Sequence, residues 1–380
     1  MIKALIDALG MAFAMGWEIL WPLILGFALS GVVQAVVSHR EMVRLLPNDR
    51  PRSIAIALAL GAASSSCSYA AVALARSLFR KGADFTAAMA FELASTNLVA
   101  ELSIIMLVLL GWRFTLAEFI GAPIMVVFLV VLFRKFLKPE LVDEARRQAE
   151  KGIAGRMEGH ADMDMSVADG GSLWRRITSQ QGRTAISHYF VMDWAAVWLD
   201  IVGGLLIAGA LAAWVPQEFW QSFFLVDHPV LAKIWGPIVG PLVAVIAFVC
   251  SVGNIPLAAV LWNGGISFGG VIAFIFADLI VLPVLDIYRK YYGLKMAGFL
   301  FVTFYAAMAV AALIVEGIFG ALGLVPAQRN AQIVEAAIAW NYTTWLNIAF
   351  LALAALFVWR FLNTGGPAML RMMNRPAHSN

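Results

Sequence analysis

The chain has 380 residues, of which 62% are hydrophobic and only 13% are charged, and its mean hydropathy is +0.82. A soluble globular protein is about half apolar and about a quarter charged, so this composition excludes a water-soluble fold and indicates a polytopic membrane protein. The net charge of +3 is small, and the basic residues lie beside apolar segments, which argues against nucleic-acid binding.

The apolar residues form nine long blocks, at 10–37, 53–79, 83–110, 116–137, 194–214, 234–262, 268–285, 297–324 and 345–359. Most of them exceed the roughly 20 residues that a helix needs to cross a bilayer. Helices are expected throughout, because a helix satisfies its own backbone groups inside lipid. The first block is too long for a cleavable signal peptide and lacks a small-residue cleavage site after a basic start.

The two halves of the chain resemble each other at an offset of 182–183 residues. Leu23–Leu29 matches Leu205–Leu211, and Cys67-Ser68 falls on Cys250-Ser251. Such self-similarity indicates a duplicated unit. We therefore expect a first membrane repeat over 1–137, a cytoplasmic linker over 138–190, a second membrane repeat over 191–325, and an extra C-terminal span with a cytoplasmic tail over 326–380.

The positive-inside rule distinguishes two topologies. If all nine blocks cross the membrane, the 27 basic residues divide almost evenly between its two sides. If blocks 53–79 and 234–262 are re-entrant hairpins instead, each half crosses three times, and only 4 of the 27 basic residues lie outside, leaving 23 inside. An odd number of crossings inverts the second half. The expected fold is all-α, with two inverted repeats, re-entrant or broken helices and one C-terminal span.

The motifs Gly61–Ser68 and Cys250–Pro256 interrupt two apolar blocks with small residues, an Asn and a Pro. Interruptions of this kind free backbone groups, which a membrane protein tolerates only where protein or a water-filled cavity satisfies them. Close helix packing also uses Ser and Gly, but recurrence in both halves favours a site. The candidate substrate contacts are Ser66, Cys67, Ser68, Cys250, Ser251 and Asn254, together with Asn97 from the next segment; the two cysteines are also the candidate metal ligands.

Carboxylates within the apolar blocks are further candidates. Glu92, Glu101 and Asp278 are assigned to coupling or gating, because an ionised carboxylate costs roughly 2.5–3.5 kcal/mol at the centre of a span. The Met- and His-containing linker tract Met157–Met165 is either a metal-sensing segment or a solvated linker. The chain has no phosphate-binding loop and no hydrolase or metalloprotease motif, so we expect neither an enzyme nor a bound cofactor.

Four segments carry a family resemblance: Ala94–Val99, Cys250–Pro256, Ala277–Asp286 and Ile287–Gly293. In them the chain resembles the predicted-permease family that includes the organoarsenical efflux permeases of the ArsP type, and the resemblance covers nearly all of the chain except the linker and tail. It implies export of trivalent methylated or aromatic arsenicals, or of arsenite, from the bacterial cytoplasm. The first motif continues as Cys67–Ala73 and lacks the Gly and Pro of the second, which leaves the substrate within the family open.

The leading functional interpretation is a secondary-active exporter of a soft metalloid, because trivalent arsenic prefers thiolate and the chain has only two thiols. A permease for another metal ion or a small sulfur compound is the alternative. A membrane thiol oxidoreductase that cycles Cys67 with Cys250 is weaker, because no Cys-x-x-Cys pair and no quinone or flavin site is visible. The expected location is the bacterial cytoplasmic (inner) membrane, with the metalloid and the lipid bilayer as partners. Homo-oligomer formation stays open.

Overall fold

The computed structural model describes residues 2–36, 44–64, 68–150, 165, 167, 173–247, 251–329, 331, 340 and 342–373. Within these ranges the chain is helical and forms no strand, which confirms the all-α class. Seven helices or consecutive helix pairs of this part are long and apolar enough to cross a membrane: 19–36, 85–109, 112–136, 229–246, 268–292, 294–321 and 342–363. The protein is therefore a polytopic membrane protein, as its composition predicts.

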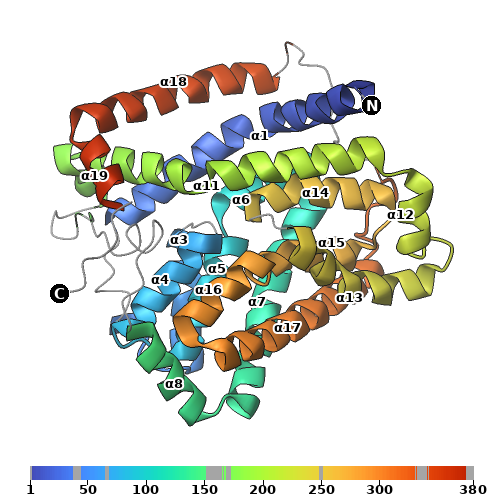
Figure 1. Ribbon diagram of the computed structural model, residues 1–380, viewed down its shortest axis with the longest axis horizontal. Coiled ribbons are helices and arrows are strands. Elements are labelled where there is room, and N and C mark those ends of the chain that lie inside the picture. Colours follow the sequence, from blue (N-terminus) through green and yellow to red (C-terminus); the bar gives the residue numbers. More distant parts are fainter. Residues whose placement is uncertain are drawn as a thin grey trace.

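The same order of helices occurs twice along the chain (Figure 1). The first set is α1 (Ile2–Val36), α3 (Pro51–Ser64), α4 (Ser68–Arg80), α5 (Phe85–Asn97), α6 (Ala100–Leu109) and α7 (Trp112–Phe136). The second set is α11 (Gln180–Trp214), α13 (Pro229–Ala247), α14 (Ser251–Gly264), α15 (Phe268–Phe276) with the 3-10 turn η1 (Ala277–Leu279), α16 (Leu282–Tyr292) and α17 (Leu294–Ala321).

The remaining helices connect or follow the two sets: α8 (Pro139–Glu150), α10 (Leu173–Thr178), α12 (Gln217–Phe223), α18 (Tyr342–Asn363) and α19 (Gly366–Met373). Helix α11 begins inside the segment expected to be linker. The reason is local, since the Ser179 hydroxyl accepts a hydrogen bond from the Gly182 amide at 2.9 Å and caps the helix there.

Helices α1 and α11, which are equivalent in the two sets, run in opposite directions side by side (Figure 1). Gly209 near the end of α11 lies against Ala8 near the start of α1, while Gly31 near the end of α1 lies against Ile186 near the start of α11. The absence of a side chain on each glycine lets the two backbones approach closely. Helix α18 packs against both.

In the second half, α13 and α14 form a hairpin that returns to the end of the bundle from which it started. Gly236 lies against Ser267 and Gly240 against Phe274, so α13 runs parallel to α15. A tight turn at Gly265, whose φ of +117° suits glycine, reverses the chain between α14 and α15. Helix α14 therefore runs antiparallel to α13 and packs against α15.

The first half has the same hairpin, made of α3 and α4. The Asp84 amide donates to the Leu46 carbonyl at 2.9 Å, which brings the chain just before α3 to the start of α5. Farther along, Gly61 of α3 lies against Phe91 of α5, so these helices are also parallel. The turn between α4 and α5 contains Gly82, with a φ of +109°. Both interrupted apolar blocks thus follow the hairpin course expected from the charge distribution.

Two arginines, separated by the repeat offset of 183 residues, bind the turns at which the two hairpins lead into the next helices, α5 and α15. Arg146 of α8 donates to the Phe79 carbonyl at 2.6 Å, and its guanidinium lies 4.0 Å from the centre of the Phe79 ring. Arg329 donates to the carbonyls of Trp262 and Ile266 at 2.9 and 2.6 Å and lies 4.4 Å from the Trp262 ring. Both 146 to 329 and 79 to 262 are steps of 183 residues, so the repeat extends into the predicted linker. We call Arg146 and Arg329 the hairpin clamps.

The two halves exchange contacts around a common core. Helix α4 packs against α16, and α14 packs against α6, so each hairpin contacts a helix of the other half. Helices α6 and α16 are the second parts of the discontinuous spans Phe85–Leu109 and Phe268–Tyr292, each of which is broken near its middle. Ser68 and Ser251, the first described residues of α4 and α14, are called the hairpin tips; they and the two breaks lie where the two halves of the chain meet.

Candidate functional site

Three buried side chains meet where the hairpin tips reach the second discontinuous span. The hydroxyl oxygens of Ser68 and Ser251 lie 2.9 Å apart, although 183 residues separate them in sequence. Both hydroxyls donate to Oδ2 of Asp278, Ser68 at 2.9 Å. All three side chains are buried. We call Ser68, Ser251 and Asp278 the serine-aspartate cluster.

The described parts of helices α4 and α14 begin at the two serines of this cluster. Two helices, one from each half of the chain, therefore meet at the Asp278 carboxylate through the first of their residues that the structure describes.

The breaks in the two discontinuous spans have different local causes. In the second, Val281 is extended, with ψ of 149°, and a proline occupies the first turn of α16, where the missing amide is tolerated. In the first, Val99 is extended, with ψ of 150°. The hydroxyl of Ser95 and the amide of Asn97 bond back to the carbonyls of Glu92 and Leu93 at 2.8 and 3.0 Å, which competes with the regular helical pattern.

Glu92 lies within electrostatic range of Asp278. Its Oε1 accepts a hydrogen bond from the Tyr288 hydroxyl, which comes from α16 of the other half, 196 residues away. Its Oε2 has no hydrogen-bond partner among the described residues. The site thus contains two buried carboxyl groups, one from each half of the chain.

Several polar atoms at this depth have no partner in the described part of the protein. They are Oδ1 of Asp278, Oε2 of Glu92, and both side-chain atoms of Asn254, which lies one turn after Ser251 on α14. A buried polar group left without a hydrogen bond costs about 1–3 kcal/mol. These atoms are therefore suited to bind a ligand, an ion or water.

Two of the predicted residues bond or pack elsewhere. The Asn97 amide is turned toward its own helix and donates to the Leu93 carbonyl and the Thr96 hydroxyl. Glu101, in the first turn of α6, is buried against Gly26 of α1 and lies near Asp193. The Thr96 hydroxyl, which was not among the candidate site residues although it lies in the motif segment Ala94–Val99, is close to the Asp278 carboxylate.

The predicted ligands Ser66, Cys67 and Cys250 lie outside the described residues, as does the linker tract except for Met165. Each cysteine directly precedes a serine of the serine-aspartate cluster in the sequence. Among the residues that the structure does describe, no group of three or more His, Cys, Asp or Glu side chains is arranged to hold a metal ion.

Three buried carboxylates, Glu118, Asp193 and Glu316, escaped the sequence analysis. Glu118 of α7 is buried, and neither of its oxygens has a hydrogen-bond partner in the described ranges. Asp193 of α11 accepts hydrogen bonds from Ser30 and Gln34, both at 3.1 Å. The rule that selected Glu92, a carboxylate inside an apolar block, also applies to Glu118. Tyr288 lies in the motif segment Ile287–Gly293, but a tyrosine near the end of a span is common at membrane interfaces and did not by itself indicate a site.

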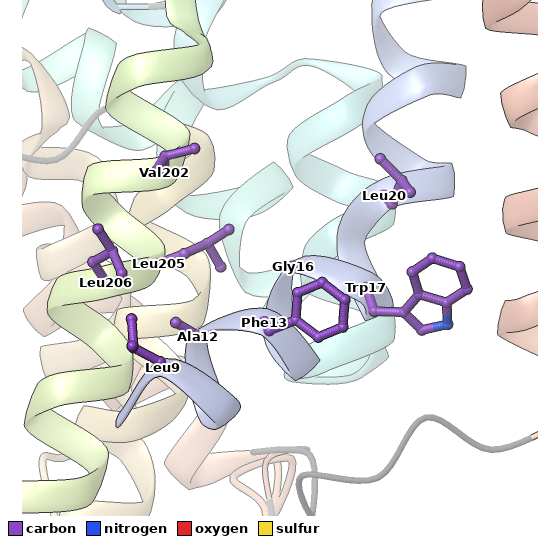
Figure 2. A pocket seen from close by; sticks show the side chains of 9 residues that line it. All are labelled: Leu9, Ala12, Phe13, Gly16, Trp17, Leu20, Val202, Leu205 and Leu206. Atoms are coloured by element: carbon purple, nitrogen blue, oxygen red, sulfur yellow. The ribbon is translucent and has the colours of Figure 1, made fainter. Parts of the chain in front are cut away.

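A large apolar pocket lies between α1 and α11, away from the polar residues described above (Figure 2). Its volume is about 610 Å³, and its lining is almost entirely carbon, with the Trp17 indole nitrogen as the one exception that Figure 2 displays. It is lined by Leu9, Ala12, Phe13, Gly16, Trp17, Leu20, Val202, Leu205 and Leu206. None of these side chains can coordinate a soft ion, so the pocket offers apolar contact only.

The comparisons with known proteins show the family to which the chain belongs. The protein named "Putative permease Rv2963" from Mycobacterium tuberculosis is 63% identical over 338 residues, which cover 89% of this chain and 83% of that protein. No solved structure matches. The family model described as a predicted permease, ArsP_1, matches residues 4–317. These matches confirm the resemblance read from the motif segments and identify a multi-pass membrane permease: the chain belongs to the ArsP_1 family of predicted permeases.

Proposed function

We propose that this permease is a secondary-active exporter of a soft trivalent metalloid, such as a methylated or aromatic arsenical or arsenite. The observation that carries the proposal is the meeting of Ser68 and Ser251 on Asp278. Cys67 and Cys250 are the residues next to these serines, and consecutive α-carbons are only about 3.8 Å apart. Two thiols beside two hydroxyls offer a soft ligand pair with hydrogen-bond donors around it.

A site of this composition suits transport better than storage. Two thiols hold a trivalent arsenical less tightly than a closed cage of three or four thiolates, so the substrate can leave. Asn254 adds an unsatisfied donor and an unsatisfied acceptor one turn from Ser251. These polar atoms can bind the hydroxyl groups of an arsenous acid, while the sulfur atoms bind arsenic.

We assign coupling to the carboxyl groups of Glu92 and Asp278. A carboxyl group in a low-dielectric interior is uncharged unless a cation or hydrogen-bond donors stabilise its charge, so it can take up and release a proton during a transport cycle. Tyr288 donates to Glu92, and two serines donate to Asp278, so both groups can exist in either form. Glu101 is assigned a gating role at the contact between α6 and α1.

The repeats are proposed to be inverted in the membrane. The opposite directions of the equivalent helices α1 and α11 support this orientation. In this arrangement one hairpin enters the site from the cytoplasm and the other from outside. Alternating access then consists of one hairpin withdrawing while the other stays closed.

The test of the proposed function is metalloid resistance. Cells that lack their own arsenic exporters are grown with phenylarsine oxide, methylarsenite or arsenite, with and without the full chain. We expect resistance to at least one compound and its loss in Cys250→Ser and Cys67→Ser, at unchanged protein level in the membrane. Ser222→Ala, on the exposed surface of α12, is the matched control and should protect like the wild type.

Two results contradict the proposal in different ways. A wild-type chain that protects against none of the three compounds contradicts the substrate class and favours a permease for another metal ion or a small sulfur compound. A double serine variant with full resistance shows instead that the thiols only pack, and that the Ser and Asn groups recognise the substrate alone.

A further inference from the structure

Glu118 has a buried carboxyl group to which nothing above assigns a role. Its side chain is 1% exposed, and neither oxygen has a hydrogen-bond partner among the described residues. An ionised carboxylate without a partner at this depth costs several kcal/mol. In the state that the structure represents, Glu118 is therefore expected to be neutral, which means that it holds a proton.

The packing of α7 fixes where this proton lies. The rings of Phe114 and Phe268 are 4.6 Å apart, and a Cβ on Gly121 would lie 2.8 Å from the Phe276 ring, so α7 runs parallel to α15. Glu118 lies between these two contacts along α7. It is thus level with the middle of α15 and within electrostatic range of Asp278, which follows α15 directly.

On its other side, α7 packs antiparallel to α17. Phe133 contacts Phe299, with ring centres 5.2 Å apart, and Gly121 lies against Val315. Glu118 is therefore at the level of Glu316, the residue after Val315. The Glu316 carboxylate accepts a hydrogen bond from the Gly269 amide at 2.5 Å, at the start of α15.

Glu316 lines a pocket of about 230 Å³. Its charged and hydroxyl-bearing lining residues are Lys233, Ser267, Glu316 and Arg329. The pocket lies at the start of the discontinuous span Phe268–Tyr292, while Tyr288 and Tyr292 lie at its end. Glu92 and Tyr288 are therefore on the opposite side of Asp278 from the pocket, and Glu118 is on the pocket side.

Several charged groups lie on the elements packed against α7, and they set the electrostatic surroundings of Glu118. They are Glu92 on α5, Glu101 on α6, Asp278 in η1 after α15, and Lys295 and Glu316 on α17. Lys295 is in the first turn of α17, at the end where Phe299 contacts Phe133, and thus far along the helix from Glu316. Of these groups, Asp278 is the one that acts electrostatically on Glu118, and its charge is negative. When two carboxyl groups act on each other electrostatically, the charge of one disfavours ionisation of the other, so one of the two keeps a proton.

We propose that Glu118 is a proton-carrying residue that connects Asp278 with the pocket lined by Lys233, Glu316 and Arg329. The step transfers a proton only: the Glu118 carboxylic acid protonates the Asp278 carboxylate, and the carboxylate left on Glu118 takes a proton from a hydronium ion in the water that enters the pocket, which leaves neutral water. Asp278 releases its hydrogen bonds from the two hairpin serines when it is protonated, which loosens the contact between the hairpin tips. This inference rests on the proposed function in assuming ion-coupled transport, but not on the substrate being an arsenical.

The first test needs no substrate. The purified full chain in proteoliposomes is treated with dicyclohexylcarbodiimide, which modifies protonated carboxyl groups in apolar surroundings, and the adducts are located by mass spectrometry. We expect an adduct on Glu118 that is lost as the pH is raised. Absence of this adduct at every pH, or an adduct whose yield does not change with pH, overturns the proposal.

The second test measures coupling. Inside-out vesicles are given an inwardly acidic pH gradient and phenylarsine oxide, and the retained arsenic is measured. Glu118→Gln, which keeps the shape of the side chain, should abolish uptake driven by the gradient. The control for replacing a carboxylate by an amide is Asp286→Asn, at a residue of α16 whose side chain is 45% exposed and forms ion pairs with Arg289 and Lys290, and it should take up arsenic like the wild type. Monodisperse elution and equal protein level are checked for both variants.

The outcomes separate the two proposals. Normal gradient-driven uptake by Glu118→Gln overturns the role of Glu118 and leaves the exporter intact. If the wild type moves no arsenical, the exporter proposal is wrong, and the carbodiimide experiment then decides on Glu118 by itself.

Discussion

Removal of a hairpin clamp should destabilise the protein by an amount that its contacts predict. Arg329 donates from one nitrogen to two backbone carbonyls, at 2.9 and 2.6 Å, and covers the Trp262 ring. Burial lowers the pKa of its guanidinium group, and the Glu316 carboxylate opposes this shift. The variant Arg329→Ala removes both hydrogen bonds and the ring contact at the turn between α14 and α15.

Hydrogen bonds from a charged donor contribute about 1.5–3 kcal/mol each. The ring contact adds about 1 kcal/mol, and restricting the long side chain costs about 2 kcal/mol. The expected loss is therefore roughly 2–5 kcal/mol in the free energy of unfolding. Arg146→Ala should cost less, because its second hydrogen bond, to Ala83, is 3.4 Å long and its ring partner is Phe79 rather than Trp.

The assay is the apparent melting temperature of the full chain in detergent, followed by fluorescence-detected size exclusion. We expect the order wild type, Arg146→Ala, Arg329→Ala from most to least stable. Arg329→Lys should recover only part of the loss, because an ammonium group lacks the planar donors that bind and stack at once. If Arg329→Ala melts at the wild-type temperature, the clamp contacts contribute nothing and the reasoning is wrong.

Three further predictions concern packing, pH and topology. Gly61→Ala places a Cβ 2.5 Å from the Phe91 carbonyl oxygen, so it should destabilise the protein by about 1–3 kcal/mol in the same melting assay, and an unchanged melting temperature contradicts the close approach. Burial raises the pKa of Asp84 above its ordinary value of 3.8, so the folded protein favours the protonated side chain. The contribution of this group to the free energy of unfolding is therefore complete below about pH 4 and is lost as the pH rises through the raised pKa. Asp84→Asn should flatten this part of the melting profile, and an identical profile argues against it. Cysteines placed at Arg44 and Lys290 should resist an impermeant thiol reagent in intact cells, and labelling of both from outside would favour nine crossings.

Much of the fold could be predicted from the sequence, because in a membrane protein hydropathy and charge act along the chain. The apolar blocks predicted the helices, and the distribution of basic residues predicted the hairpins at 53–79 and 234–262. The repeat offset of 183 residues, first seen in the cysteine motifs, recurs in the contacts of Arg146 and Arg329. These features are local or repeated, so one sequence is enough to find them.

The site was predicted only in part, because its members meet across long separations. Ser68, Ser251 and Asp278 were all selected, yet nothing in the sequence indicated that both hydroxyls bond to the one carboxylate. The bond between Tyr288 and Glu92 links positions 196 residues apart. Glu118 was overlooked, although it lies inside the apolar block 116–137 and the rule that selected Glu92 applies to it. Asn97 was assigned to the substrate, but its side-chain orientation depends on the local break in the helix.

The exchange of contacts between the two halves has a consequence for how the protein is made. Ser68 and its partner Asp278 are separated by 210 residues, so the first hairpin is synthesised long before the residue that it binds. At about 5–20 residues per second, the delay is about 10–40 s. During this interval α4 lacks α16, and its polar tip has no partner from the second half. The nascent chain must therefore keep an unfinished hairpin at the membrane until the ribosome has completed α16, and this waiting stage is when insertion factors and proteases can act on it.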